Sequence, residues 1–238
     1  MVSTHPLLIA HRGASASAQG NTLAAFVLAV AQDADGVEID VRRTADGHLV
    51  LHHDPLVPGI GAIIGVDLST LRRRAPHIPT LDEMLDVTGD LLIDVEIKND
   101  PGEPDHDPNH GVADAVAAWV AARDLRQRVM VSSFNPGTTS RILALDPSIT
   151  TGQLLDGGVD MDLMGAAAAV AEAGHHWVLP ADRLLGNDPG PVIDAVHATR
   201  LRIGVWTVNG ADRLARLAAA GIDAIVTDDP GAALQALT

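Results

Sequence analysis

Gly36-Val37-Glu38-Ile39-Asp40-Val41 is the stretch that decides the fold, because apolar side chains and carboxylates alternate along it. Side chains on a strand point alternately to its two faces, so the two carboxylates share one face and the apolar residues share the other. Leu91–Ile97 repeats the pattern, with Glu96 followed by Lys98 on one parity and apolar residues on the other. Each segment is therefore predicted to be a strand that packs its apolar face against helices and turns its charged face toward a polar cavity.

Further out, short apolar runs alternate with longer helical stretches, which is typical of βα units in a parallel sheet. Eight such units in 238 residues favour a (β/α)8 TIM barrel over a doubly wound open sheet. In this barrel an extra hairpin strand is expected after the second barrel strand. We expect one barrel domain over residues 1–238. The predicted strands are Leu7–Ala10, Gly36–Val41, Leu91–Ile97, Val129–Ser132, Ile149–Leu154, His176–Leu179, Arg202–Val208 and Ala224–Thr227. The predicted helices are Thr22–Gln32, Pro79–Val87, Gly111–Arg123, Thr138–Leu145, Leu163–Ala173, Pro191–Ala198 and Ala211–Ala219.

The composition excludes several classes of function. There is no cysteine, which rules out disulfides and thiolate chemistry. A net charge of −15 and only 2% aromatic residues argue against nucleic-acid and anionic-membrane partners. No run of apolar residues is long enough to span a membrane, and the N-terminus lacks the features of a signal peptide. We therefore expect a cytoplasmic protein of unknown oligomeric state.

The ends of the predicted strands carry the polar residues, which is where barrels place their chemistry. His11 and Arg12 end the first strand, and Glu38 and Asp40 lie near the end of the second. The third strand ends with Glu96 and Lys98.

A hairpin is expected to bring a second histidine to these carboxylates. Asp46-Gly47 is a strong signal for a two-residue turn. That register pairs Ala45 with His48 and Asp40 with His53, and it turns His52 away. A bulge would shift the register by one residue and exchange the two histidines.

Three carboxylates in one mouth repel each other, so a bound cation is the simplest way to neutralise them. Carboxylate oxygens suit Mg²⁺ or Ca²⁺ as the divalent metal. With such an ion, Arg12 and Lys98, the set carries one net positive charge, which a phosphodiester would balance.

Together with further motifs along the sequence, these residues resemble the glycerophosphodiester phosphodiesterase family. The resemblance runs along essentially the whole sequence, and the matching motifs appear in the family's order. They are His11-Arg12-Gly13, Asn21-Thr22, Gly36–Val41, Thr44-Ala45-Asp46-Gly47, His53-Asp54, Ile78-Pro79-Thr80-Leu81, Glu96-Ile97-Lys98, Ser133-Phe134, Trp206-Thr207-Val208-Asn209 and Thr227-Asp228.

This resemblance implies a metal-dependent TIM barrel that hydrolyses glycerophosphodiesters to glycerol 3-phosphate and an alcohol. By motif position, Glu38, Asp40 and Glu96 would be the metal ligands and His11 and His53 the acid–base pair. Arg12 and Lys98 would hold phosphate oxygens. Trp206, Phe134 and Gln153 are further candidates for contacts with the substrate.

One departure from the family stands in the first loop, where Gln19-Gly20 replaces the usual Pro-Glu before Asn21-Thr22. The loss of that carboxylate keeps a non-catalytic glycerophosphate-binding barrel open as an alternative. A phospholipase D or lyase type of phosphodiesterase is a second alternative, and an unrelated metal-dependent barrel such as an amidohydrolase is a third. The acidic segment Asp100–His110 is expected to be a solvated loop, with a second cation site as the other reading.

Overall fold

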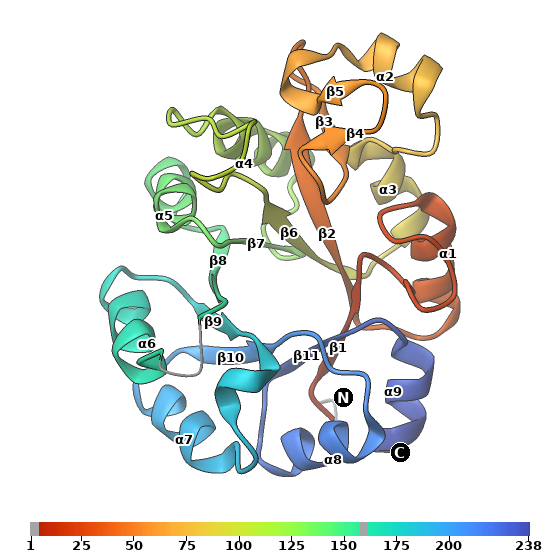
Figure 1. Cartoon of the computed structure of the whole chain (residues 1–238). Coiled ribbons are helices and arrows are strands. Elements are labelled where there is room, and N and C mark those ends of the chain that lie inside the picture. Colours follow the sequence, from red (N-terminus) through yellow and green to blue (C-terminus); the bar gives the residue numbers. More distant parts are fainter. Residues whose placement is uncertain (1–4, 158–160) are drawn as a thin grey trace.

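The computed structural model describes residues 5–157 and 161–238, and it confirms the predicted barrel (Figure 1). Eight parallel strands form a closed ring, because β1 pairs with both its sequence neighbour β2 and the last strand β11. The barrel strands are β1 (Leu7–His11), β2 (Gly36–Arg43), β6 (Leu92–Ile97), β7 (Val129–Ser133), β8 (Thr150–Leu155), β9 (Trp177–Pro180), β10 (Arg202–Val205) and β11 (Ala224–Thr227).

Helices surround this ring on the outside (Figure 1). Among the described residues they are α1 (Leu23–Ala31), α2 (Leu68–Arg74), α3 (Leu81–Thr88), α4 (Gly111–Arg123), α5 (Pro136–Leu145), α6 (Leu163–Glu172), α7 (Gly190–Ala198), α8 (Ala211–Ala219) and α9 (Pro230–Leu237). The sequence predicted seven of them, with Gly111–Arg123 and Ala211–Ala219 correct at both ends. The predicted strand Arg202–Val208 is too long, because the strand ends at Val205.

The alternation along β2 sorts its side chains as predicted. Val37, Ile39 and Val41 are fully buried against the helices, in a cluster that includes Phe26 of α1. A separate apolar cluster inside the ring contains Ile9, Leu154, Trp177 and Leu179. The interior of the ring is therefore apolar toward the later strands and polar beside β2 and β6.

The hairpin after β2 is present, but its predicted register is wrong by one residue. β3 (Leu49–Leu51) pairs with β2 so that Val41 lies opposite Leu51 and Arg43 opposite Leu49. Thr44 N donates to His48 O, which leaves a three-residue loop from Ala45 to Gly47. Gly47 has φ +89°, the left-handed conformation that closes a three-residue hairpin loop. An Asp-Gly pair serves two- and three-residue turns alike, so the sequence did not distinguish the two registers.

The segment that follows β3 was not resolved into elements by the sequence pattern. It contains the two-stranded sheet β4 (Leu56–Val57) and β5 (Gly61–Ala62), the short 3-10 helix Ile63–Gly65 and helix α2. A small apolar core of its own holds it together. Within the described part of the chain, no helix has both the length and the apolar character needed to cross a membrane.

Candidate active site

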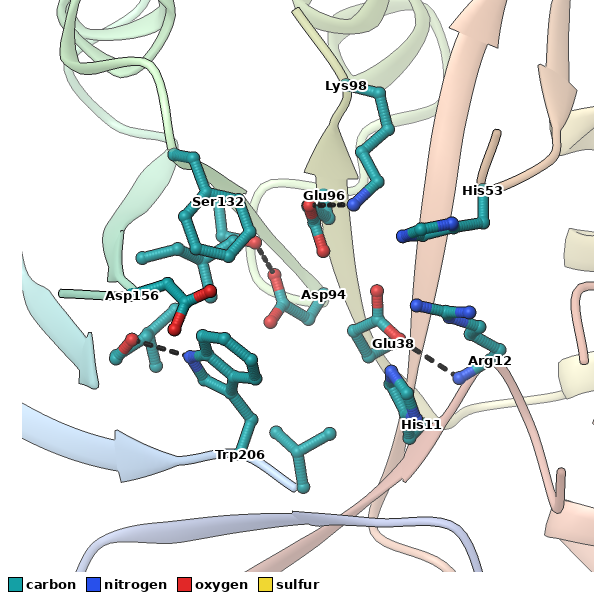
Figure 2. A pocket seen from close by; sticks show the side chains of 14 residues that line it. His11, Arg12, Glu38, His53, Asp94, Glu96, Lys98, Ser132, Asp156 and Trp206 are labelled. Atoms are coloured by element: carbon teal, nitrogen blue, oxygen red, sulfur yellow. Dashed lines mark hydrogen bonds and ion pairs between the residues drawn. The ribbon is translucent and has the colours of Figure 1, made fainter. Parts of the chain in front are cut away.

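A cavity of about 200 Å³ opens at the carboxyl ends of the barrel strands (Figure 2). Charged residues of β1, β2 and β6 line one side of it, and mostly apolar residues of the later strands line the other. The lining residues are His11, Arg12, Glu38, His53, Asp94, Glu96, Lys98, Ser132, Phe134, Leu154, Asp156, Leu179, Trp206 and Val226.

The three predicted metal ligands come together at this cavity. The parallel register of β2 and β6 places Glu38 beside Asp94 and Asp40 beside Glu96. Glu38, Asp40 and Glu96 are all buried, and each offers an oxygen within 4.8 Å of the others. The convergence follows from strand parity, since all three carboxylates lie on the inward face of adjacent strands.

The two predicted cations lie against the same carboxylates. Lys98 Nζ lies 2.5 Å from Glu96 Oε1 and 3.1 Å from Asp40 Oδ1. Arg12 Nε lies 3.0 Å from Asp40 Oδ2, and the main-chain N–H of Arg12 donates to Glu38 Oε2 at 2.9 Å. Asn21 Nδ2 also donates to Asp40 Oδ2, at 2.6 Å, which gives the Asn21-Thr22 motif a role in positioning that carboxylate.

The surroundings push the pKa values of these acids apart. Burial and then repulsion by Asp40 raise the pKa of Glu38 well above its usual range, and the same two causes raise the pKa of Glu96 to about 7. For Asp40, burial favours a higher pKa, but Lys98 and Arg12 outweigh it and the pKa is lowered. The protein's own cations therefore compensate one carboxylate and leave the other two short of positive charge.

The lack of positive charge beside Glu38 and Glu96 indicates that the three carboxylates fit a metal ion. Glu38 Oε1 is buried and makes no hydrogen bond. A buried acceptor without a partner is destabilised, and carboxylate oxygens are the donors that hard divalent cations prefer. Glu38, Asp40 and Glu96 can thus hold such an ion together.

His11 points into the cavity from the end of β1 and is held from behind. Its Nδ1 lies 2.7 Å from Asp228 Oδ1, and Asp228 also accepts from Ser15 Oγ at 2.9 Å. Burial lowers the pKa of His11, while the hydrogen bond to Asp228 works in the opposite direction. These two residues are 217 positions apart, so no local pattern predicts their contact.

His53 reaches the cavity from the segment just beyond β3. His52 rather than His53 lies opposite Asp40, since His52 N donates to Asp40 O at 3.0 Å, and the His53 ring lies on the same side of the cavity as Glu38 and Arg12 (Figure 2). His53 Nδ1 lies 2.7 Å from Asp54 Oδ1. His52 turns away and bonds the carbonyl of Asp54. The structure thus places His53 and not His52 in the cavity lining, although the register from which this was expected is wrong.

Arg42 anchors the main chain of His53, a role that was not predicted from the sequence. The Arg42 side chain is 1% exposed, and all five of its N–H groups are used. Nε and Nη2 donate to His53 O at 3.0 and 2.5 Å. Nη1 and Nη2 donate the other three hydrogen bonds, to Glu103 and Asp105. The acidic segment Asp100–His110 is thus partly buried against a cation, which corrects the expectation of a solvated loop.

Of the three predicted substrate contacts, two line the cavity and one does not. Phe134 and Trp206 meet edge to face with ring centroids 5.5 Å apart. Gln153 lies outside the lining, and its amide donates to the carbonyls of Ser133 and Phe134. We therefore interpret Gln153 as a brace between β7 and β8.

Two acids in the lining were not predicted as site residues. Asp94 accepts from Ser132 Oγ at 2.7 Å, and burial raises its pKa to about 7. Asp156 lies on the apolar side of the mouth (Figure 2). In the first loop, a Cβ at Gly20 would lie 2.9 Å from Arg12 Cβ, so this glycine leaves room for the arginine to turn toward Asp40.

A closed barrel with an acidic cluster, two cations and two imidazoles at its mouth defines a class of barrels suited to phosphodiester chemistry. The Glycerophosphoryl diester phosphodiesterase family matches residues 11–232. The chain belongs to this family.

Individual relatives agree with that assignment. The chain is 29% identical to the glycerophosphodiester phosphodiesterase of Caldanaerobacter subterraneus subsp. tengcongensis, over 94% of each chain. It is 27% identical to the glycerophosphodiester phosphodiesterase of Bacillus altitudinis, over 96% of each chain.

Solved structures share the fold. A glycerophosphodiester phosphodiesterase from Thermotoga maritima has a TM-score of 0.82 at 24% identity, covering 97% of this chain and 98% of that one. An Oleispira antarctica phosphodiesterase in complex with the product sn-glycerol-3-phosphate has a TM-score of 0.79 at 23% identity, covering 98% of this chain and 97% of that one.

Proposed function

We propose that this protein hydrolyses small glycerophosphodiesters to glycerol 3-phosphate and an alcohol. The observation that carries the proposal is the meeting of Glu38, Asp40 and Glu96 with His11 and His53 around one cavity, in a member of this family. Arg12 and Lys98 lie at the same cavity and would contact the phosphate oxygens.

The metal is proposed to be Mg²⁺ or Ca²⁺, held by Glu38, Asp40 and Glu96. When bound, such an ion withdraws charge from the phosphoryl oxygens and stabilises the negative charge that develops there. With the ion in place, Arg12 and Lys98 leave the site one positive charge in excess, and the single negative charge of a phosphodiester balances it.

The two imidazoles are proposed to move the protons. In the first step, one imidazole accepts the proton of the substrate's own glycerol hydroxyl as that oxygen bonds to phosphorus, and the other protonates the departing alcohol oxygen as the P–O bond breaks. In the second step the roles reverse, and water opens the cyclic phosphate. Imidazoles suit both roles because their usual pKa lies near neutral pH.

Asp228 is proposed to prepare His11 for this work. A carboxylate can only accept, so the short contact at Nδ1 places a proton on that nitrogen and leaves Nε2 for the substrate. The carboxylate also stabilises the imidazolium that forms when Nε2 takes up a proton.

The proposal is tested by incubating the protein with glycerophosphocholine in Mg²⁺, in Ca²⁺ and in excess chelator. We expect glycerol 3-phosphate with metal and none with chelator. Turnover that survives chelation would favour the lyase type of phosphodiesterase, and tight binding without turnover would favour a non-catalytic barrel. Both results would contradict the proposal.

The ligand role of Glu96 has its own test. Glu96→Gln keeps the shape of the side chain and removes its charge, so we expect metal affinity, measured by calorimetric titration, to fall at least about tenfold. Excess metal should restore part of the turnover. Glu172→Gln, on the outer helix α6, is the matched control and should leave the affinity unchanged. Unchanged affinity in Glu96→Gln itself would remove Glu96 from the ligand set.

A cytoplasmic location and a single domain over residues 1–238 remain predictions from the sequence.

A further inference from the structure

The two sides of the mouth cavity offer different chemistry to the two substituents of a phosphodiester. The side formed by β1, β2, β6 and the hairpin carries the acids, the cations and both imidazoles. The opposite wall, from β7 to β11, is lined by Phe134, Leu154, Leu179, Trp206 and Val226. Asp156 is the one charged lining residue on that wall, within residues 5–157 and 161–238.

The aromatic corner of this wall is held in place. Trp206 Nε1 donates to Leu179 O at 2.8 Å, which fixes the indole ring, and the Phe134 ring packs against it at 86°. Lys98 Nζ already lies 5.7 Å from the centre of the Phe134 ring. Aromatic faces attract cations, and tryptophan does so most strongly. The Trp206 ring can therefore attract a second positive group in addition to Lys98, which lies over Phe134.

Asp156 adds a negative charge beside that corner. Figure 2 shows its carboxylate turned into the cavity next to the Trp206 ring. Asp156 forms an ion pair with Arg183, whose side chain is not part of the cavity lining. The two side chains are 45% and 51% exposed, and ion pairs this exposed to water are weak. A cation inside the cavity can therefore compete with Arg183 for this carboxylate.

We propose that this wall is a subsite for the alcohol part of the substrate and that it selects alcohols carrying a quaternary ammonium group, as choline does. The inference rests on the proposed phosphodiesterase activity. A trimethylammonium group is apolar on its surface, carries a positive charge and has no hydrogen-bond donor to satisfy. Glycerol hydroxyls would lie unpaired against Leu154, Leu179 and Val226, whereas Asp94 and Ser132 offer them partners at the cavity floor.

The test compares kcat/KM for three substrates that differ only in the alcohol: glycerophosphocholine, glycerophosphoethanolamine and glycerophosphoglycerol. We expect the choline ester to be preferred over the neutral glycerol ester by about tenfold, the scale of one cation–aromatic contact reinforced by a carboxylate. The ethanolamine ester should lie between them, because a primary ammonium is more strongly hydrated.

Two variants should move that preference in opposite directions. Asp156→Asn removes the negative charge from the wall and should lower the choline-to-glycerol ratio toward one. Arg183→Gln removes the competing cation and should raise the ratio above that of the unaltered protein. Asp188→Asn removes an equal charge from an exposed position outside the cavity and should leave the ratio unchanged.

The outcomes separate this inference from the proposed function. If none of the three esters is hydrolysed, the proposed function fails. If all are hydrolysed at equal kcat/KM, or the ethanolamine ester is preferred, the function stands and the quaternary ammonium subsite is overturned. A choline preference that Asp156→Asn leaves intact would also overturn it, because the carboxylate would then have no part in the selection.

Discussion

The end of β1 and the segment after β3 each deliver one imidazole to the mouth, and they hold it in different ways. His11 belongs to a barrel strand, and Asp228 from the neighbouring strand end fixes its ring. His53 lies beyond the last paired residue of the hairpin, and its side chain is 45% exposed. Its position depends on Arg42, which grips its main-chain carbonyl.

The difference shows two routes to a preorganised site. Strand parity and a fixed register place His11, so nearly any sequence that forms this barrel directs residue 11 inward. For His53, one main-chain hydrogen bond from His52 to Asp40 and a fully buried guanidinium with two acidic partners take the place of that register. The region after β3 should therefore be the more sensitive of the two to a change outside the imidazole itself.

The largest effects are expected from the imidazoles themselves. His11→Ala and His53→Ala should each lower kcat by more than about a hundredfold, the scale of lost acid–base catalysis. His52→Ala is the matched control, because its ring bonds the carbonyl of Asp54 outside the cavity. Steady-state assays at saturating metal measure all three. A His52→Ala defect as large as that of His53→Ala would reverse the assignment of the two neighbours.

The anchor at Arg42 should come next. Arg42→Met leaves Glu103 and Asp105 without their cation and is expected to lower the free energy of unfolding by about 3–5 kcal/mol. Among molecules that stay folded, kcat should fall by about ten- to a hundredfold, because the His53 ring loses its fixed position.

Two companions sharpen that result. Arg42→Lys keeps the charge without the five-donor fork, so kcat should stay low while part of the stability returns. Arg141→Met breaks an exposed pair with Asp114 and should change the free energy of unfolding, measured in urea, by less than about 1 kcal/mol. Full kcat in folded Arg42→Met would mean that His53 needs no anchor.

On the β1 side, Asp228→Asn should shift a pH limb and also lower the maximal rate, by less than the loss of either imidazole, because an amide no longer enforces the His11 tautomer that leaves Nε2 for the substrate. Burial lowers the pKa of His11 and Asp228 opposes this, so removal of the carboxylate charge should lower that pKa further. If His11 acts as a base, activity is lost as pH falls through its pKa, and the limb moves to lower pH. If it acts as an acid, activity is lost as pH rises through the same pKa, and that limb also moves down.

The profile of kcat/KM against pH, together with NMR titration of the His11 ring, measures this shift. Asp223→Asn is the control, because Asp223 pairs with His197 away from the mouth. A limb that moves to higher pH in Asp228→Asn would contradict the electrostatic role given to Asp228.

The smallest effect is expected at the hairpin turn. Gly47→Ala places a side chain at φ +89° with no neighbour within 4 Å, so the loss is purely conformational, about 1 kcal/mol of unfolding free energy. Gly65→Ala, also in open space but at an ordinary φ, should be close to neutral. Neither change should alter kcat, since the turn lies at the opposite end of the hairpin from His53. A fall in kcat for Gly47→Ala alone would show that the turn does affect the position of His53.

Strand parity explains which parts of the site were visible in the sequence. Glu38 and Asp40 alternate with apolar residues on one strand, and Glu96 repeats the alternation on the next, so their convergence follows from local pattern and a parallel register. The family motifs added His11 and His53, and both line the cavity.

The parts that were missed depend on long-range or ambiguous information. Asp228 has no local reason to contact His11, because ring closure alone makes the first and last strands neighbours. Arg42 and Arg43 are adjacent, and only the folded register shows that the first is fully buried while the second stays partly exposed. The Asp-Gly motif occurs in hairpin loops of two and of three residues, so the sequence does not determine the hairpin register.

The seam between β1 and β11 has a consequence for when the molecule becomes active. His11 is synthesised before the whole acidic cluster, and its partner Asp228 follows 217 residues later. A nascent chain could assemble most of the acidic cluster early, since Glu38, Asp40 and Glu96 all lie in its first half. His11 would stay without its partner carboxylate until β11 and Asp228 have been synthesised, so the site is complete only once the ring of strands can close.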